Sequence, residues 1–487
     1  MRNRKKLQVS FLKEKYNKVP VQAKLAMWLM ICTLIQRGIS LITVPLYTRL
    51  MSLEEYGYVS TYFSWVSIAL ILSSFKLNAG VYNKGLSKFK EDRDGYCLSM
   101  QYTTSVITVF LLLLYVAFHK WVNDFMEMST GIILFMFVEL FFSTSMGFWT
   151  VKEQYDFHYK PIVRATMIYA LLNLILGLIF VINAETGTKG YARIFSVVVV
   201  QAIVGGFFYM VNMKRGKFRF NLVYSVFAVK FNIPLIPHYF SEYILNQSDR
   251  IMIQKLCNYS DVALYSVAYN AGMLLTIITS SINQALTPWI YQSLDEKNFK
   301  QINKVILSIA IVIMIPIIIF IAVAPEAIYI LAGKQYSEAV YVVPPVAGSI
   351  VFLFLYTVFA NVEFYYDYNK FTMYISLVGA VFNIILNYFF IKLFGFVAAG
   401  YTTFICYFVY CVGHYLFMNY IVKKREQQRI FDSKALIGLF VGLLIMMILM
   451  SMTYNQIIVR YGIIVVITVV SCLKRRELFK VIRYIKK

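Results

Sequence analysis

The chain has 487 residues, of which 60% are hydrophobic and 15% are charged, and its mean hydropathy is +0.65. These values exclude an ordinary soluble protein and indicate a polytopic membrane protein. The formal net charge of +23 would suggest nucleic-acid binding in a soluble protein, but no basic segment here is large enough to fold as a nucleic-acid-binding module.

The first predicted element is a long apolar segment at residues 23–50, which follows a basic N-terminus. About 20 apolar residues are enough to cross a bilayer. The segment still carries polar side chains at every third or fourth position, including Gln36 and Arg37, and these share one face of a helix. A charge at mid-span costs roughly 2.5–3.5 kcal/mol on insertion scales, so Arg37 should face a water-filled cavity or a partner such as Glu139.

Thirteen more apolar segments of spanning length follow, which predicts fourteen spans in all: 57–80, 96–118, 129–150, 161–182, 190–212, 226–250, 259–287, 303–324, 336–360, 371–391, 395–420, 434–453 and 457–473. The N-terminus and every second loop carry clusters of Lys and Arg, whereas the alternate loops carry few. By the positive-inside rule both termini are cytoplasmic, and this requires an even number of spans.

An internal repeat relates the two halves. At a constant offset of 210, Glu153 matches Glu363 and Asn173 matches Asn383, and with a small gap Arg49 matches Arg250. The repeat unit is six spans, so the sequence predicts an all-α membrane fold of 14 transmembrane helices, with two six-helix bundles related by a pseudo-twofold axis along the membrane normal and two C-terminal helices. The predicted domains are a cytoplasmic basic N-terminus at 1–22, a first lobe (spans 1–6) at 23–215, a second lobe (spans 7–12) at 216–422, spans 13–14 at 423–473 and a cytoplasmic basic tail at 474–487.

Polar stripes occupy the first two spans of each repeat, and this predicts a central cavity lined by equivalent helices, where repeat transporters place their substrate. The candidate substrate-binding residues are Arg37, Arg49, Lys76, Arg250, Gln36, Asn78, Tyr265, Tyr269 and Asn283. The alternative interpretation is that stripes of small polar residues only pack helices together.

Three of the cations have a second interpretation. Arg49 and Arg250 lie at the predicted outer ends of spans 1 and 7, where each could line the cavity mouth or cap a helix C-terminus. Lys76 lies near the cytoplasmic end of span 2 and could snorkel to the interface instead of binding substrate.

Three carboxylates inside the spans are candidates for coupling transport to H⁺ or Na⁺, and their alternative role is in structural ion pairs: Glu139, Glu242 and Asp249. The six cysteines show no metal-ligand spacing and mostly fall in apolar runs. We therefore expect no metal site, no catalytic residues and no cofactor beyond a coupling ion.

Several motifs resemble those of one transporter family. They are the residues PLYTRLM at 45–51, SDRIM at 248–252, PEAIYILAGKQY at 325–336 and NIILN at 383–387. With these motifs the chain resembles the polysaccharide transporter family of the multidrug/oligosaccharidyl-lipid/polysaccharide exporter superfamily, and within it the O-antigen and capsule repeat-unit flippases.

The resemblance implies that the protein is not an enzyme but moves undecaprenyl-pyrophosphate-linked oligosaccharides from the cytoplasmic to the outer leaflet of the bacterial inner membrane by alternating access. The implied partners are the lipid-linked oligosaccharide, membrane lipid and other polysaccharide-assembly membrane proteins, and no nucleic acid. In the lipid II flippase branch the two extra helices form a groove for the lipid tail, and the same could apply here.

Four other functions stay open. An ion-coupled multidrug exporter of the same fold would favour a cavity dominated by carboxylates, whereas the charges most clearly inside spans 1 and 2 are basic. A lipid II flippase would share the fold. A membrane polysaccharide polymerase or glycosyltransferase would need a substantial outer loop, and the outer links here are short. The last is a non-catalytic scaffold. Because the pyrophosphate is anionic, we expect span 1 with Arg37 to hold it.

Overall fold

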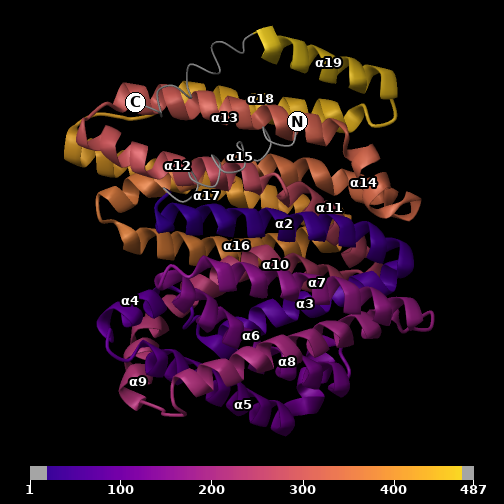
Figure 1. Ribbon diagram of the computed structural model, residues 1–487. Helices are drawn as coiled ribbons and strands as arrows, with labels where there is room; N and C mark the ends of the chain where they lie inside the picture. Colours follow the sequence, from indigo (N-terminus) through magenta and orange to yellow (C-terminus); the bar gives the residue numbers. More distant parts are fainter. Residues whose placement is uncertain (1–18, 474–487) are drawn as a thin grey trace, which may run out of the picture. The chain divides into compact units, whose positions relative to one another are not determined.

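The computed structural model describes residues 19–473 of the chain, and each element in this part is a helix (Figure 1). The first half forms α2 (Val21–Leu50), α3 (Leu53–Ser74), α4 (Gly80–Lys88), α5 (Arg93–Met126), α6 (Thr130–Tyr155), α7 (Tyr159–Asn183), α8 (Lys189–Arg215) and α9 (Leu222–Asn232). The prediction of an all-helical chain is confirmed. The predicted tail at 474–487 and most of the predicted N-terminal segment lie outside the described residues.

The second half begins with a short 3-10 helix, η1 (Ile233–Leu235), and a second one, η2 (Lys334–Val342), precedes α15. The α-helices of this half are α10 (Ile236–Leu256), α11 (Tyr259–Met273), α12 (Thr276–Asp295), α13 (Phe299–Ala322), α14 (Ala324–Ala332), α15 (Val343–Tyr365), α16 (Asn369–Phe394), α17 (Val397–Glu426), α18 (Ser433–Met452) and α19 (Ile457–Leu473).

Eleven segments within residues 19–473 are long and apolar enough to cross a bilayer. The predicted spans that are not among them correspond to α3, α10 and α19, of which α19 has a shorter apolar stretch at Ile457–Val470. Helix α10 is polar for a membrane helix because it carries Glu242, Asp249 and Arg250. The count of fourteen spans therefore stays a prediction.

The predicted end of the second span is wrong. Helix α3 ends at Ser74, because Phe75 and Lys76 adopt left-handed backbone conformations with φ of 48° and 51°. The side-chain amide of Asn232 donates hydrogen bonds of 2.8 and 2.9 Å to the carbonyl oxygens of Phe75 and Lys76, just beyond the helix end. Lys76 and Asn78 thus lie in a turn and not within a spanning helix.

Two other predicted spans are interrupted. The segment predicted at 226–250 divides at η1, which contains Pro234, so that α10 begins only at Ile236. The segment predicted at 259–287 divides into α11 and α12 around Leu274 and Leu275. Proline removes a backbone donor and so accounts for the first break.

The helices form two compact units. Among the described residues, the first unit comprises the chain up to Leu50 together with Val66–Ile236, and the second comprises Met51–Trp65 together with the chain from Pro237 onward. The predicted lobe boundaries stay predictions.

Both units contain the same order of packed helices. In the first unit α6 packs against α5 and α8, and α7 packs against α8. In the second unit α15 packs against α13 and α17, and α16 packs against α17. These are the equivalent helices under the predicted six-span repeat, so each unit reproduces the same packing pattern internally (Figure 1).

The largest hydrophobic core belongs to the second unit and is built from α12, α13, α15, α17 and α18, with Ile306, Phe359 and Leu443 fully buried. In the first unit a smaller core joins α4, α5 and α6 through Tyr82, Tyr96 and Phe148. Helices in lipid gain little from hydrophobic burial, so close van der Waals packing of this kind is what holds them together.

An arginine of the last helix in the described chain binds two neighbouring helices. Arg460 of α19 is 2% exposed and forms hydrogen bonds of 2.6 and 2.5 Å with the two carboxylate oxygens of Glu326 in α14. Its guanidinium also donates to the carbonyl oxygen of Ala322, at the end of α13, at 2.7 Å. Arg460 thus satisfies a helix C-terminus and an acidic side chain at once.

Candidate functional site

A buried carboxylate lies at the centre of the polar interior of the second unit. Asp249 of α10 is completely buried, and it accepts hydrogen bonds from three other helices. The Tyr265 hydroxyl of α11 donates to it, the Asn387 amide of α16 donates at 2.6 Å, and the Thr403 hydroxyl of α17 donates at 3.0 Å. A buried carboxylate is tolerated only when it is hydrogen-bonded in this way, so four helices are tied together at Asp249.

A second layer of side chains orients the first. The Thr402 hydroxyl donates to Asn387 Oδ1, and Asn387 Nδ2 also donates to Asn383 Oδ1 at 3.2 Å. The Ser248 hydroxyl donates to the same Asn383 oxygen at 3.3 Å. Asn383 and Asn387 are four residues apart, so both lie on one face of α16. A network with this many satisfied groups fixes the geometry around the carboxylate.

Arg250 lies beside this network and is also buried, at 6% exposed. Its guanidinium donates to the Asn246 carbonyl at 3.0 Å, to Ser266 Oγ at 3.2 Å and to Asn270 Oδ1 at 3.2 Å, and it lies 4.7 Å from the ring centroid of Tyr269. Arg250 lies inside α10, which continues to Leu256, so it does not cap the helix C-terminus. It binds a backbone carbonyl within its own helix and holds α11 against α10.

The second unit thus brings together four residues predicted from the sequence: Asp249, Arg250, Tyr265 and Tyr269. Tyr269 completes the group because its hydroxyl donates to Asn246 Oδ1 at 3.2 Å. What the sequence did not predict is how many donors from α16 and α17 surround Asp249. The sequence signals for the α16 donors were the NIILN motif, which contains Asn383 and Asn387, and the repeat that pairs Asn383 with Asn173; Thr403 of α17 had none.

A cavity of about 340 Å³ lies within the second unit, walled by α10, α15, α16 and α17. Asn246 belongs both to its wall and to the Arg250 network. The predicted carboxylate Glu242, one turn before Asn246 on α10, and His238, a further turn back, also line the cavity. Among the described residues, the imidazole Nδ1 of His238 is buried without a hydrogen-bond partner.

The inner wall of this cavity contains a carboxylate–histidine pair. His414 of α17 lines the cavity, and its Nδ1 lies 2.9 and 3.0 Å from the two carboxylate oxygens of Glu363 in α15. Both side chains are essentially inaccessible to solvent. The ring of Tyr356 stacks on His414 with centroids 5.5 Å apart. This pair was not predicted, although Glu363 belongs to the internal repeat.

In the first unit, the helices α7 and α8, which correspond to α16 and α17 under the repeat, carry a cation. Arg193 of α8 donates to Asn173 Oδ1 of α7 at 3.0 Å and to Ser196 Oγ at 3.2 Å, and its guanidinium lies 4.7 Å from the ring centroid of Tyr47 in α2. At the repeat offset of 210, Asn173 corresponds to Asn383 and Arg193 to Thr403. The equivalent helices therefore hold an arginine in the first unit and surround an aspartate in the second.

The other predicted substrate residues lie apart from the Asp249 network in the contacts that the described residues show. Arg37 is exposed on α2 and Gln36 is half-buried. Arg49 is exposed and donates to the carbonyl oxygen of Pro45 at 2.9 Å, which fits the helix-capping interpretation. Glu139 is buried in α6. Within the part of the chain that the structure describes, Asn283 Oδ1 of α12 is buried without a hydrogen-bond partner.

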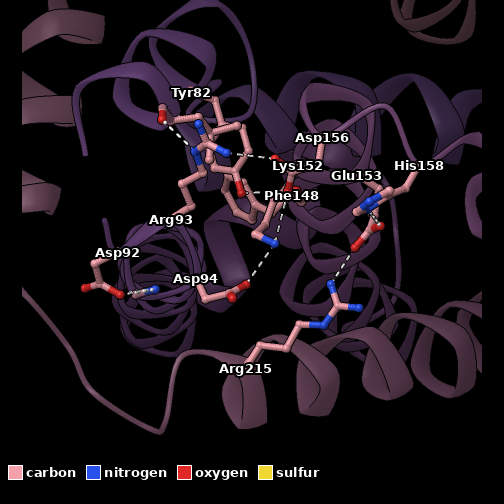
Figure 2. Close-up of polar contacts among 12 residues, drawn as sticks. Tyr82, Asp92, Arg93, Asp94, Phe148, Lys152, Glu153, Asp156, His158 and Arg215 are labelled. Atoms are coloured by element: carbon pink, nitrogen blue, oxygen red, sulfur yellow. Dashed lines mark hydrogen bonds and ion pairs between the residues drawn. The ribbon is translucent and has the colours of Figure 1, made fainter. Parts of the chain in front are cut away.

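Several loop cations of the first unit are paired with carboxylates (Figure 2). Arg93 lies 2.9 Å from Asp156, and Lys152 lies 3.0 Å from Asp94 and 3.5 Å from Asp156. Figure 2 also shows Glu153 between Arg215, at 2.5 Å, and His158, at 2.9 Å. These contacts join the start of α5 to the ends of α6 and α8, so the cations stabilise the fold as well as contributing to the charge of the loops.

Two family sequence models match the chain. The model described as polysaccharide biosynthesis protein matches residues 23–294, and the model described as MatE matches residues 234–389. The second match includes Asp249, Glu242 and the asparagines of α16.

Two curated relatives come from Haemophilus influenzae. The chain is 26% identical over 196 residues to the Lsg locus putative protein 1, which is 39% of this chain and 49% of the relative. It is 23% identical over 185 residues to an uncharacterized membrane protein, which is 37% of this chain and 46% of that relative. The chain thus matches about half the length of each relative.

Solved transporter structures have the same fold. The lipid II flippase MurJ in an inward closed conformation is 13% identical, with a TM-score of 0.66 over 92% of this chain and 99% of MurJ. An inward-facing multidrug resistance MATE family transporter is also 13% identical, with a TM-score of 0.58 over 80% of this chain and 99% of the transporter. A transporter of the same superfamily from Pyrococcus furiosus is 14% identical, with a TM-score of 0.56 over 83% of this chain and 95% of that one.

These matches and the apolar helices describe a multi-pass membrane protein whose fold is shared with solved transporters and flippases. The predicted resemblance to a polysaccharide family is confirmed, because one sequence model covers more than half of the chain. The chain belongs to the polysaccharide biosynthesis protein family.

Proposed function

We propose that the protein is a flippase that moves undecaprenyl-pyrophosphate-linked oligosaccharide repeat units across the bacterial inner membrane, for the synthesis of O-antigen, capsule or another exopolysaccharide. The observation that carries the proposal is the match of residues 23–294 to the polysaccharide biosynthesis family. The similarity of the fold to a lipid II flippase over 99% of that chain supports it.

The chemistry of the described residues fits the three parts of such a substrate, which are the pyrophosphate, the sugar and the polyprenyl chain. Arg37 is exposed on α2 and would attract the anionic pyrophosphate, since a cation on a membrane helix is kept only where it has a polar partner or water. The polar cavity of the second unit suits sugar, and the exposed apolar side chains of the long helices suit the polyprenyl chain.

Asp249 would couple transport to H⁺ or Na⁺. Among the described residues, two hydroxyls and one amide N–H donate hydrogen bonds to its carboxylate, and carboxylate and hydroxyl oxygens are ligands that hard cations such as Na⁺ prefer. Asp249 would therefore bind a proton itself, or Na⁺ together with the hydroxyl oxygens of Tyr265 and Thr403 once their hydrogens turn away. Dependence of transport on an imposed Na⁺ or pH gradient in proteoliposomes tests this role.

The transport cycle would follow alternating access, with both termini in the cytoplasm and with other polysaccharide-assembly membrane proteins as partners. The repeat of six spans and the alternation of loop charge support this topology. Labelling of single cysteines placed in the loops of intact cells checks the orientation.

A second candidate function is ion-coupled export of drugs. The MatE match over residues 234–389 and the buried Asp249 favour it. Efflux of cationic dyes by cells that express the protein separates this function from lipid-linked sugar transport, because the flippase is expected to leave dye accumulation unchanged.

The deciding experiment is deletion of the gene from its own host. We expect loss of surface polysaccharide and accumulation of one lipid-linked repeat unit, both restored by the intact gene. Accumulation of lipid II would reassign the protein as a lipid II flippase, and normal polysaccharide would refute the proposal.

A further inference from the structure

We infer that the cavity of about 340 Å³ in the second unit is a subsite for one hexose ring of the transported repeat unit, and that it prefers an amino sugar and rejects acidic sugars. The inference rests on the proposed function for the source of the sugar. The volume lies at the low end of the range of about 300–1,000 Å³ that small-molecule sites occupy, so the cavity suits a small ring and not a whole oligosaccharide.

Aromatic side chains form part of the wall. Tyr356, Tyr407 and Tyr410 all line the cavity. The rings of Tyr356 and Tyr407 are nearly parallel, with centroids 6.5 Å apart and an interplanar angle of 14°. The face of an aromatic ring carries partial negative charge, and the C–H bonds on one side of a pyranose carry partial positive charge, so the two surfaces attract. A sugar ring is the class of ligand that matches tyrosine faces on one side and polar groups on the other.

One polar atom of a lining residue has no partner, and other polar side chains line the same cavity. His238 Nδ1 is buried and has no hydrogen-bond partner among residues 19–473. An orphaned buried polar atom costs about 1–3 kcal/mol, and a ligand hydroxyl would remove that cost. Asn246, Asn361 and Thr357 add amide and hydroxyl groups to the wall. This density of polar groups argues against a purely apolar ligand such as a lipid tail.

The charged side chains that line the cavity determine which sugars it prefers. Among the residues whose side chains the structure describes, the titratable groups on its wall are Glu242, His238, His414 and the three tyrosines, and neither lysine nor arginine lines it. His414 is already engaged by Glu363. Glu242 is thus the charge available to a ligand, and it attracts an ammonium group and repels a carboxylate or a pyrophosphate. The pyrophosphate must then be held elsewhere.

The test uses the full-length protein in lipid nanodiscs and three small probes: methyl glucosaminide, methyl glucoside and methyl glucuronide. Binding is measured by saturation-transfer NMR, which detects weak ligands through their ring protons. We expect the glucosaminide to bind most tightly, the glucoside about tenfold more weakly and the glucuronide not at all; a tenfold difference corresponds to about 1.4 kcal/mol.

Three variants make the test specific. Tyr407→Ala should abolish binding of all probes, and Glu242→Gln should remove only the preference for the amine. Glu338→Gln is the matched control and should bind like the unchanged protein, because Glu338 lines another pocket. Since Glu242 is exposed, its substitution should not disturb folding, which keeps the test decisive even if Tyr407→Ala is unstable. Two results would overturn the inference. One is binding of the glucuronide as tight as that of the glucosaminide, and the other is an unchanged preference for the glucosaminide in Glu242→Gln.

The binding assay needs no transport, so its result is independent of the proposed function. Accumulation of a lipid-linked repeat unit in the deletion strain without probe binding would keep the flippase and discard the subsite. Probe binding without such accumulation would keep the subsite and discard the flippase.

Discussion

The side-chain amide of Asn387 donates a 2.6 Å hydrogen bond to the carboxylate of Asp249, although 138 residues separate the two in the sequence. Their contact joins α10 to α16 in the interior of the second unit. A buried carboxylate inside a membrane protein is usually kept for function, because a structural role could be filled at lower cost by an apolar side chain.

Asp249→Asn tests whether the charge itself is needed. Asparagine has the same shape and can keep hydrogen bonds to Tyr265 and Thr403, so the protein should still accumulate in the membrane. We expect transport to fall by about tenfold or more, the equivalent of about 1.4 kcal/mol, because an amide cannot take up a proton or neutralise Na⁺. The readouts are surface polysaccharide and membrane abundance. Full polysaccharide production by this variant would exclude Asp249 from ion coupling.

Arg37→Ala tests the predicted attraction of pyrophosphate by α2. Because Arg37 is exposed, its removal should leave the folded protein unchanged. We expect surface polysaccharide to be lost in a complementation assay, with partial recovery in Arg37→Lys, which keeps the charge. Lys120→Ala removes another exposed cation and serves as the control. Wild-type polysaccharide in Arg37→Ala would remove Arg37 from the substrate site.

Gly57→Ala should destabilise the second unit. A Cβ atom at Gly57 would lie 1.7 Å from the backbone oxygen of Tyr259, and backbone cannot move aside as a side chain can. Overpacking of this kind costs typically about 1–3 kcal/mol. Gly38→Ala is the matched control, because a Cβ there meets no atom within 4 Å and alanine favours the helix. Thermal unfolding in detergent should show a lower midpoint for the first variant alone.

The pairing of Arg460 with Glu326 predicts that α19 is held less firmly in acid. Burial raises the pKa of the Glu326 carboxyl, but hydrogen bonds from Arg460 outweigh burial and hold this pKa below its ordinary value. A carboxyl whose pKa is lowered by folding stabilises the fold at neutral pH, and this contribution is lost as the pH falls through the pKa of the folded state. The protection of α19 amides against hydrogen exchange, corrected for the slower intrinsic exchange in acid, should therefore fall at low pH, and Arg460→Met should show this loss of protection already at neutral pH. Exchange that is insensitive to both changes would contradict the prediction.

The sequence identified several residues of the site but not the neighbouring helices that surround them. Asp249, Arg250, Tyr265 and Tyr269 share polar stripes with helical spacing, and a stripe identifies which helix face is polar. It does not say which other helices the face meets, so the donors from α16 and the pair of Glu363 with His414 were missed. Lys76 was misplaced for a different reason: left-handed conformations are uncommon for lysine, so its sequence gave no sign that α3 would end there.

The equivalent helices of the two units hold an arginine in one and surround an aspartate in the other, and this difference bears on how the chain evolved. A repeat of this kind implies descent from a shorter ancestor whose identical copies would have carried every interior charge twice and with the same sign. Fusion of the two copies into one gene removes that constraint, since each half can then mutate alone. Arg193 in one half and Asp249 in the other show a chain that has used this freedom to give its two halves different ionic interiors.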